Sequence, residues 1–119
     1  MELDYDTIVL DEYRTLSKGN SGFMKILLEK VRRQLEEYEP LIIADIEERR
    51  LRDLREHTHY VKPMMVSLNL IHLLDLFETV KANFENEQFD EKQINQQIDY
   101  IRKDIANIRK QVQTELDTL

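Results

Sequence analysis

The sequence predicts an all-α fold: an antiparallel four-helix bundle with a short additional N-terminal helix. Three observations support this prediction. Only 2 glycines and 2 prolines occur in 119 residues, which leaves few residues that favour turns. Apolar residues recur at steps of three and four along most of the chain, which is the period of an α-helix. Each such segment is apolar on one stripe only, and four stripes are buried most simply against one another in a bundle.

The first two predicted helices lie before residue 49. A short helix is expected over residues 7–16, followed by Lys18-Gly19-Asn20 as its C-terminal cap. A longer helix then begins, with Ser21 as the expected N-cap. Its apolar stripe consists of Phe23, Leu27, Val31, Leu35, Tyr38 and Ile42. Because Pro40 removes one backbone hydrogen bond, we expect a kink there or a helix made in two pieces.

Three further helices are predicted after this point. Residues 49–69 carry an apolar stripe made of Leu51, Leu54, Thr58, Val61, Met65 and Leu68. The next predicted helix covers residues 70–84 and ends at a polar segment. The last predicted helix starts after a break at residues 86–90 and is about 25 residues long. It has the most regular period, with Ile94, Ile98, Ile101, Ile105, Ile108, Val112 and Leu116. Its other face is polar, so it packs on one side only.

Charge and composition exclude several classes of function. The 24 acidic and 17 basic residues give a net charge of -7, which repels a nucleic-acid backbone. The densest basic stretch, residues 49–55, is interleaved with acidic residues and indicates a solvated surface. The absence of cysteine excludes disulfides and thiolate chemistry. We expect a single domain over residues 1–119, with its bundle core over 21–118, in a monomeric, cytoplasmic protein with no membrane partner.

Two of the 3 histidines fall on one predicted helix. On a helical wheel His59 lies about 130° from the centre of the apolar stripe, so it faces solvent. Lys62, Pro63 and Val66 share its side of the helix, whereas His57 lies at the edge of the stripe. A neutral imidazole is a nucleophile, and a nearby lysine can hold phosphate oxygens. The pattern therefore indicates a candidate phosphoryl acceptor with an accessible surface around it.

Residues 21–118 resemble the histidine phosphotransfer (HPt) family, the four-helix-bundle intermediates of two-component phosphorelays. The family motif is a histidine, two residues and a lysine, with a leucine five positions before the histidine. In this chain it reads His59-Tyr60-Val61-Lys62, with Leu54 ahead of it. The flanking helices are similar as well, including a proline in the middle of the preceding helix.

The resemblance implies that His59 is phosphorylated and that Lys62 stabilises the phosphate. His57 would not be the acceptor, because Tyr60 and not a lysine stands three residues after it. The implied partners are response-regulator receiver domains and a hybrid sensor histidine kinase. The chain would be a phosphohistidine carrier, not an enzyme, and it would hold no cofactor, since the receiver supplies Mg²⁺. Receivers would dock on four residues of the same helix, namely Arg55, Glu56, Pro63 and Val66.

The chain departs from the family pattern at four positions. Pro63 replaces the usual glycine, Met64 and Met65 replace small residues, and Asn69 stands at a later glycine. A proline at position 63 cannot donate to the carbonyl of His59, so we expect the helix to bend at the site. We expect Met65 to turn inward and Met64 to be the residue that most hinders a receiver.

Other kinds of site are less well supported by the pattern. A di-iron bundle needs two Glu-x-x-His pairs, but Asn69 stands where His72 would need its glutamate. His57 and His59 point to different sides of a helix, which disfavours a zinc site. We expect His72 to be a structural or surface residue. The main alternative function is a helical adaptor without phosphotransfer, either a degenerate HPt domain or an unrelated interaction bundle.

Overall fold

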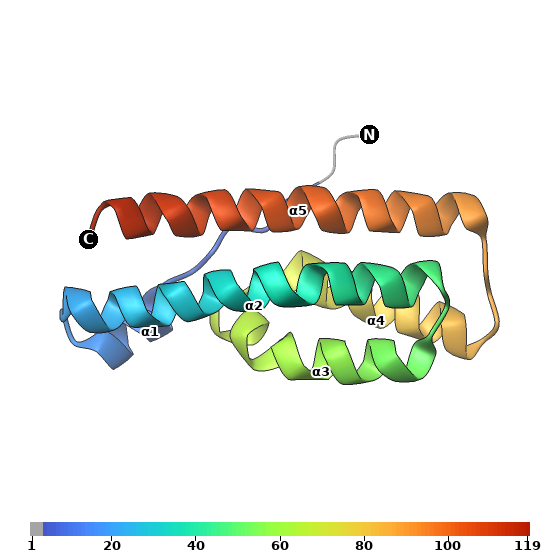
Figure 1. Cartoon of the computed structure of the whole chain (residues 1–119), viewed down its shortest axis with the longest axis horizontal. Coiled ribbons are helices and arrows are strands. Elements are labelled where there is room, and N and C mark those ends of the chain that lie inside the picture. Colours follow the sequence, from blue (N-terminus) through green and yellow to red (C-terminus); the bar gives the residue numbers. More distant parts are fainter. Residues whose placement is uncertain (1–3) are drawn as a thin grey trace.

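The computed structural model describes residues 4–119 and confirms the all-α bundle. Five helices follow one another along the chain (Figure 1). They are α1 (Asp11–Ser17), α2 (Ser21–Glu47), α3 (Leu51–Ser67), α4 (Ile71–Glu85) and α5 (Glu91–Asp117). Helices α2 to α5 form the four-helix bundle, and α1 is the short additional helix.

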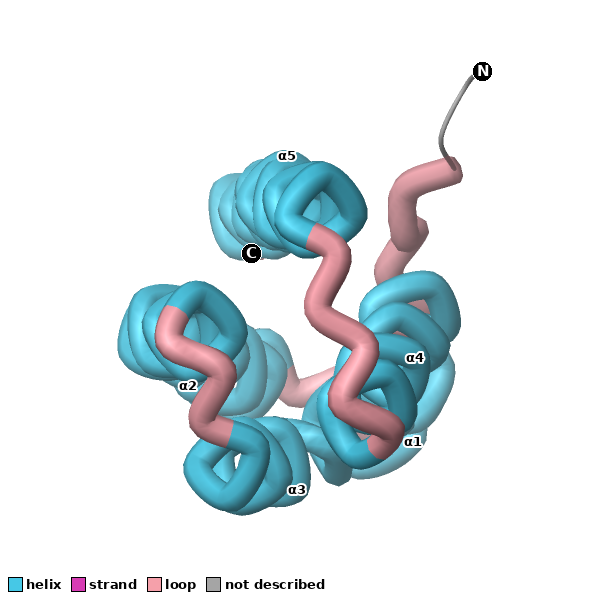
Figure 2. The backbone as a smooth tube through the Cα atoms, turned by 90° about the vertical axis from the view of Figure 1, so that its right-hand side faces the viewer, coloured by secondary structure: helices cyan, strands magenta, loops and turns pink. Residues whose placement is uncertain are grey.

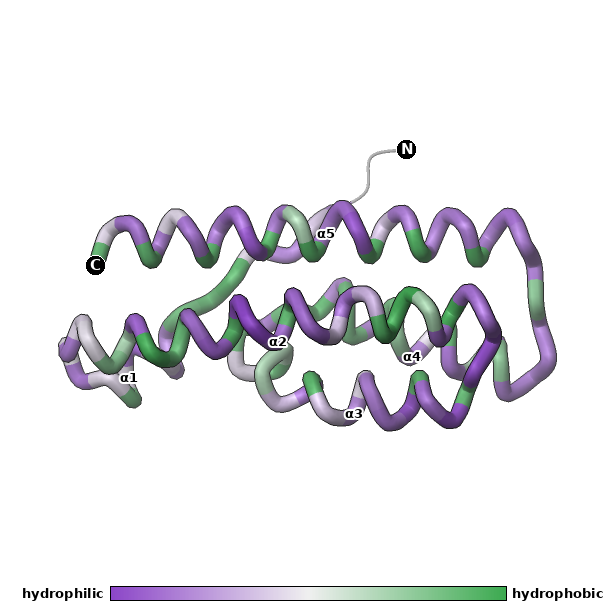
Figure 3. Tube along the Cα trace, in the orientation of Figure 1, coloured by the Kyte–Doolittle hydropathy of each residue, from purple (hydrophilic) through white to green (hydrophobic). Residues whose placement is uncertain are grey.

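The buried core lies between the four long helices. Helix α2 packs against α5 and α3, and α3 packs against α4, as the end-on view in Figure 2 shows. Hydrophobic residues of α5 line the side that faces α2 and α4 (Figure 3). Leu28 on α2, Leu54 on α3, Val80 on α4 and Ile101 on α5 have no exposed surface. The predicted stripes therefore form one common core.

Side-chain caps begin the two longest helices. The Asn20 side chain accepts a hydrogen bond of 2.9 Å from the backbone N–H of Phe23, so Asn20 is the N-cap of α2. The prediction that Ser21 is this cap is wrong by one residue: Ser21 already lies inside the helix. Asp90 caps α5 in the same way and accepts from the N–H groups of Lys92 and Gln93. These caps satisfy N–H groups that have no partner within the helix.

Helix α2 continues through Pro40 as one helix, so of the two expected outcomes, a kink or a helix in two pieces, the second does not occur. A proline inside a helix costs about 3 kcal/mol. Ile42, Ile43 and Ile46 follow the proline and are buried in the core, and they keep their places only if the helix continues. Burial of three large aliphatic side chains outweighs the lost hydrogen bond, since each contributes about 1.5–3 kcal/mol.

The short N-terminal helix begins four residues later than predicted. Residues 7–10 are not helical, and α1 starts at Asp11. The preceding segment makes hydrogen bonds with distant parts of the chain instead. The backbone N–H of Val9 donates to the carbonyl of Leu68, and that of Ile8 donates to the Gln111 side chain. These tertiary bonds replace the local bonds that a longer helix would have made.

Asp6 fixes this N-terminal segment to the bundle. Its carboxylate accepts hydrogen bonds of 2.9 and 3.0 Å from the N–H groups of His72 and Leu73, the first turn of α4. Its backbone N–H donates to the carboxyl group of Asp104 on α5. Its carbonyl accepts from the side chains of Asn107 and Gln111. A single residue therefore bridges α4 and α5.

Candidate functional site

Helix α3 places His59 on the outside of the bundle. Leu54, Val61 and Met65 on the opposite face are buried, so the orientation of the helix is fixed by its core contacts. The His59 side chain is exposed, in agreement with its predicted place on the helical wheel. A packed helix holds an exposed side chain in a defined direction, which an approaching reactant requires.

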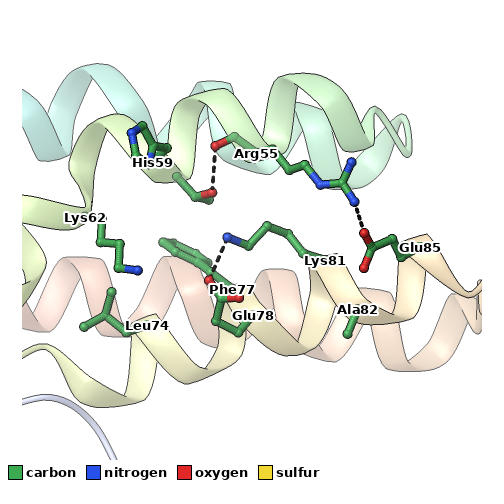
Figure 4. Close-up of a pocket in the computed structure, with 10 residues that line it drawn as sticks. Arg55, His59, Lys62, Leu74, Phe77, Glu78, Lys81, Ala82 and Glu85 are labelled. Carbon is green, nitrogen blue, oxygen red and sulfur yellow. Dashed lines mark hydrogen bonds and ion pairs between the residues drawn. The ribbon is translucent and has the colours of Figure 1, made fainter.

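A groove of about 470 Å³ lies beside His59, between α3 and α4. Figure 4 shows His59 and Lys62 along the α3 side of this groove and Lys81 and Glu78 along the α4 side. Apolar residues of α4 and polar residues of both helices contribute to its lining. The residues that line it are Arg55, Thr58, His59, Lys62, Leu74, Phe77, Glu78, Lys81, Ala82 and Glu85. The sequence-predicted residues His59 and Lys62 are thus brought together with charged groups of α4 that the prediction did not include.

The charged side chains of the groove are partly paired with one another. The Nζ atom of Lys81 lies 2.7 Å from an Oε1 atom of Glu78, and Arg55 pairs with Glu85 across the groove. The hydrogen bond from Lys81, with a further contribution from the positive charge of Lys62, lowers the pKa of Glu78. Glu78 is therefore ionised at neutral pH, and it lies within the electrostatic reach of both lysines.

Lys62 extends from α3 across the groove toward α4, near Leu74 (Figure 4). It is exposed and lies on the same side of the helix as His59. Its ammonium group is directed into the groove and not onto the imidazole ring. An anion bound beside His59 would meet this ammonium group from the groove side.

The residues predicted to contact a partner are exposed along α3. Arg55, Glu56 and Pro63 are all exposed, and the Val66 side chain keeps 57% of its surface. The α3 helix continues through Pro63 to Ser67, so the proline does not end the helix at the site. Pro63 has no N–H to donate, which leaves the carbonyl of His59 without its bond from position 63.

Met64, the residue expected to hinder a partner most, is 8% exposed and belongs to the core. Helix α3 is covered by α2 on one flank and by α4 on the other, so its buried arc is wider than one stripe. Met64 lies on the α2 flank and Met65 at the centre of the arc. Neither methionine stands on the His59 face.

His57 is held in a different way from His59. Its ring is half-buried, and its Nδ1 atom lies 2.6 Å from Oδ2 of Asp45 on α2. Asp45 is 1% exposed, and its other oxygen lies 3.4 Å from Arg50. The sequence prediction missed this pair. A signal was present, since an aspartate three residues after Ile42 stands inside the apolar stripe of α2.

His72 is the second residue of α4 and is partly buried. Its backbone N–H is one of the two bonded to the Asp6 carboxylate, so the residue has a structural place at the helix N-terminus. It does not line the groove beside His59.

Comparisons of the chain with protein-family models, with curated proteins and with solved structures find no match. Within residues 4–119, none of the helices combines the length and apolar character needed to cross a membrane. The geometry of the groove and of His59 is therefore the basis for any functional assignment.

Proposed function

We propose that this protein is a phosphorelay intermediate of the HPt type. His59 accepts a phosphoryl group from the aspartyl phosphate of one receiver domain and passes it to a second receiver. The observation that carries the proposal is an exposed imidazole on a rigid helix, at the edge of a groove into which two lysines extend. A phosphoryl acceptor needs an accessible nucleophile, positive charge and room for its partner.

The chemistry assigned to this chain is simple. In the proposed transfer, Nε2 of His59 attacks the phosphorus atom, the new N–P bond forms, and the P–O bond to the receiver aspartate breaks. The aspartate leaves as a carboxylate. The receiver holds the Mg²⁺ ion and supplies its own carboxylates, and Lys62 balances charge on the phosphoryl oxygens. This chain contributes a positioned nucleophile and a docking surface, so it is a carrier and not an enzyme.

The docking surface in this proposal follows α3 on either side of His59. Pro63 and Val66 are exposed apolar residues that lie one and two helical turns after His59. Arg55 and Glu56 are exposed charged residues that lie about one turn before it. Apolar side chains ringed by charged ones are suited to a transient protein partner.

Transfer from a phosphorylated receiver tests the proposal. The wild-type protein should acquire label that is labile in acid and stable in base, and the His59→Gln variant should acquire none. His72→Gln is the matched control, because His72 lies outside the groove, and it should be labelled like the wild type. Label that survives the His59→Gln substitution would remove His59 from the mechanism.

A helical adaptor without phosphotransfer is the alternative function. One observation favours it: Lys81 already has a carboxylate partner in Glu78, so part of the positive charge in the groove is neutralised. An adaptor would bind receivers without becoming labelled by any of them. Lys62→Ala separates the two functions, since it should slow phosphotransfer while leaving receiver binding and the helical circular dichroism signal intact.

A further inference from the structure

The groove contains a second lysine that the HPt motif does not include. Lys81 lies on α4 and its side chain is 19% exposed, compared with 60% for Lys103 on α5. Figure 4 shows Lys62 and Lys81 extending into the space between α3 and α4 from opposite sides. A charge that is partly removed from water interacts more strongly with a nearby ion. Lys81 is thus well suited to hold an anion in this groove.

Glu78 provides the present counter-ion for that lysine. Its carboxylate lies 2.7 Å from Lys81 and is also influenced by the positive charge of Lys62. The other ionised groups in the groove, Arg55 and Glu85, pair with each other. One carboxylate is therefore shared by two lysines, and the groove retains one uncompensated positive charge.

We propose that Lys62 and Lys81 together bind the phosphoryl group on His59, and that Glu78 competes with this group for Lys81. This inference rests on the proposed phosphorylation of His59. A phosphoryl group brings nearly two negative charges and three acceptor oxygens, so it attracts an ammonium group more strongly than one carboxylate does. In the unphosphorylated protein Glu78 keeps Lys81 in place, and on phosphorylation Lys81 exchanges the carboxylate for the phosphoryl oxygens.

The proposal makes opposite predictions for the two partners of one ion pair. Removal of Lys81 takes away a positive charge that favours the doubly charged phosphoryl form. Removal of the Glu78 charge takes away repulsion and frees Lys81. The protonation midpoint of the phosphoryl group should therefore rise in Lys81→Met and fall in Glu78→Gln, each by about 0.5 pH unit. A merely structural role for the pair would not move the midpoint in opposite directions.

The experiment is a ³¹P NMR pH titration of the full-length protein phosphorylated with phosphoramidate. This small donor forms the N–P bond to the imidazole and releases ammonia, so no receiver is needed. The His59→Gln variant identifies the phosphohistidine resonance that belongs to His59. The exposed pair Asp99–Lys103 on α5 supplies matched controls, Asp99→Asn and Lys103→Met, which should leave the midpoint unchanged.

The outcomes separate this inference from the proposed function. A phosphohistidine resonance that depends on His59, with a midpoint insensitive to Lys81→Met and Glu78→Gln, overturns the role of the two residues and leaves the phosphorelay proposal standing. Shifts of the same sign in both variants also overturn it. If phosphoramidate places no phosphate on His59, the imidazole is not an accessible nucleophile, and both the inference and the proposed function are wrong.

Discussion

At the scale of single residues, the two histidines of α3 differ in what holds the ring. His57 donates to the buried carboxylate of Asp45, and its ring lies edge-on to Tyr38. His59, two residues later, is exposed at the groove. A histidine bonded to a buried carboxylate serves the fold, because removing it leaves that carboxylate short of a donor.

Substitution of the two histidines should separate these roles. We expect His57→Ala to lower the free energy of unfolding by about 1–3 kcal/mol, since Asp45 would lose a hydrogen bond at a buried site. His59→Ala is the matched control and should change it by less than about 0.5 kcal/mol. Urea denaturation followed by circular dichroism measures both values. Equal destabilisation by the two substitutions would contradict the assignment of a structural role to His57 and not to His59.

A buried carboxyl group on α5 should make stability depend on pH. Asp104 has no exposed surface, and one of its oxygens lacks a hydrogen-bond partner among the described residues. Burial, together with the neighbouring Asp6, raises its pKa from 3.8 to about 6. The folded state thus binds this proton more tightly than the unfolded state does. The resulting stabilisation is complete below the unfolded-state pKa and is lost as pH rises through about 6.

The Asp104→Asn variant should remove this dependence. An amide keeps the acceptor for Asp6 and Asn107 but carries no charge at any pH. We expect the variant to become more stable relative to the wild type between pH 4 and pH 7, by roughly 2–3 kcal/mol in total. Unfolding in urea at several pH values measures this difference. Asp99→Asn, at an exposed position, should show no such trend, and a flat profile for Asp104→Asn would contradict the raised pKa.

The sequence identified the residues of the candidate site that lie on α3 but not those that lie on α4, on the other side of the groove. His59 and Lys62 share one helix, so their common side follows from helical geometry alone. Lys81 and Glu78 come from α4 and reach the groove only through tertiary packing of α3 on α4. No local pattern in the chain distinguishes these two residues from other charged residues on a solvated helix face.

At the scale of secondary-structure elements, the helix ends show how the chain turns with so few glycines. Arg49, Asn69 and Glu87 follow α2, α3 and α4, with φ angles of 56°, 59° and 57°. In each turn the next residue donates back across the helix end, as Leu70 does to the carbonyl of Met65. This left-handed conformation suits glycine best and asparagine next. Asparagine at position 69 therefore suits the conformation that this turn requires.

Glycine at one of these positions should stabilise the protein. Glu87 is exposed, and a non-glycine residue at positive φ is strained by about 1 kcal/mol. We expect Glu87→Gly to raise the free energy of unfolding by about 0.5–1 kcal/mol. Ala82→Gly, at an exposed position inside α4, is the control and should lower it by about 1 kcal/mol. Thermal unfolding measures the stability of both variants. A loss of stability in Glu87→Gly would contradict the inference that the backbone of Glu87 is strained.

The predicted helix bounds were accurate where the apolar period is regular. They were wrong where hydrogen bonds to distant residues determine where a helix begins. The period of α5 is unbroken from Ile94 to Val112, so that helix was readily predicted. Residues 8–10 are consecutive apolar residues ahead of α1, but the backbone N–H groups of Ile8 and Val9 donate to Gln111 and Leu68. One of these partners lies 103 residues away, and such distant partners cannot be inferred from a local pattern, so the start of α1 was predicted wrongly.

At the scale of the whole molecule, the four helices have unequal lengths. Helices α2 and α5 each have 27 residues, whereas α3 has 17 and α4 has 15. The shorter pair leaves part of α2 and α5 uncovered, and α1 with the N-terminal segment covers it. Leu10 and Tyr13 from this region are buried in the same core.

Because the core is continuous, shortening a buried side chain on either α3 or α5 should lower the stability of the whole protein. We expect Leu54→Ala on α3 and Ile105→Ala on α5 each to lower the free energy of unfolding by about 2–5 kcal/mol. Their exposed surfaces are 0% and 3%. Leu41→Ala, where the side chain is 39% exposed, serves as the control with a smaller loss. A small effect at position 54 or 105, measured by urea unfolding, would contradict a single shared core.

The bridge made by Asp6 has a consequence for how the protein is made. During synthesis Asp6 leaves the ribosome before Asp104, Asn107 and Gln111, its partners on α5, which lie 98 to 105 residues further along the chain. The hydrogen bonds from this segment to α5 therefore form only after α5 has been translated, whereas its bonds to Leu68, His72 and Leu73 can form earlier. Native folding is completed only after translation reaches α5, and in nascent chains stalled before that helix residues 6–9 should be cut by proteases more readily than in the folded protein.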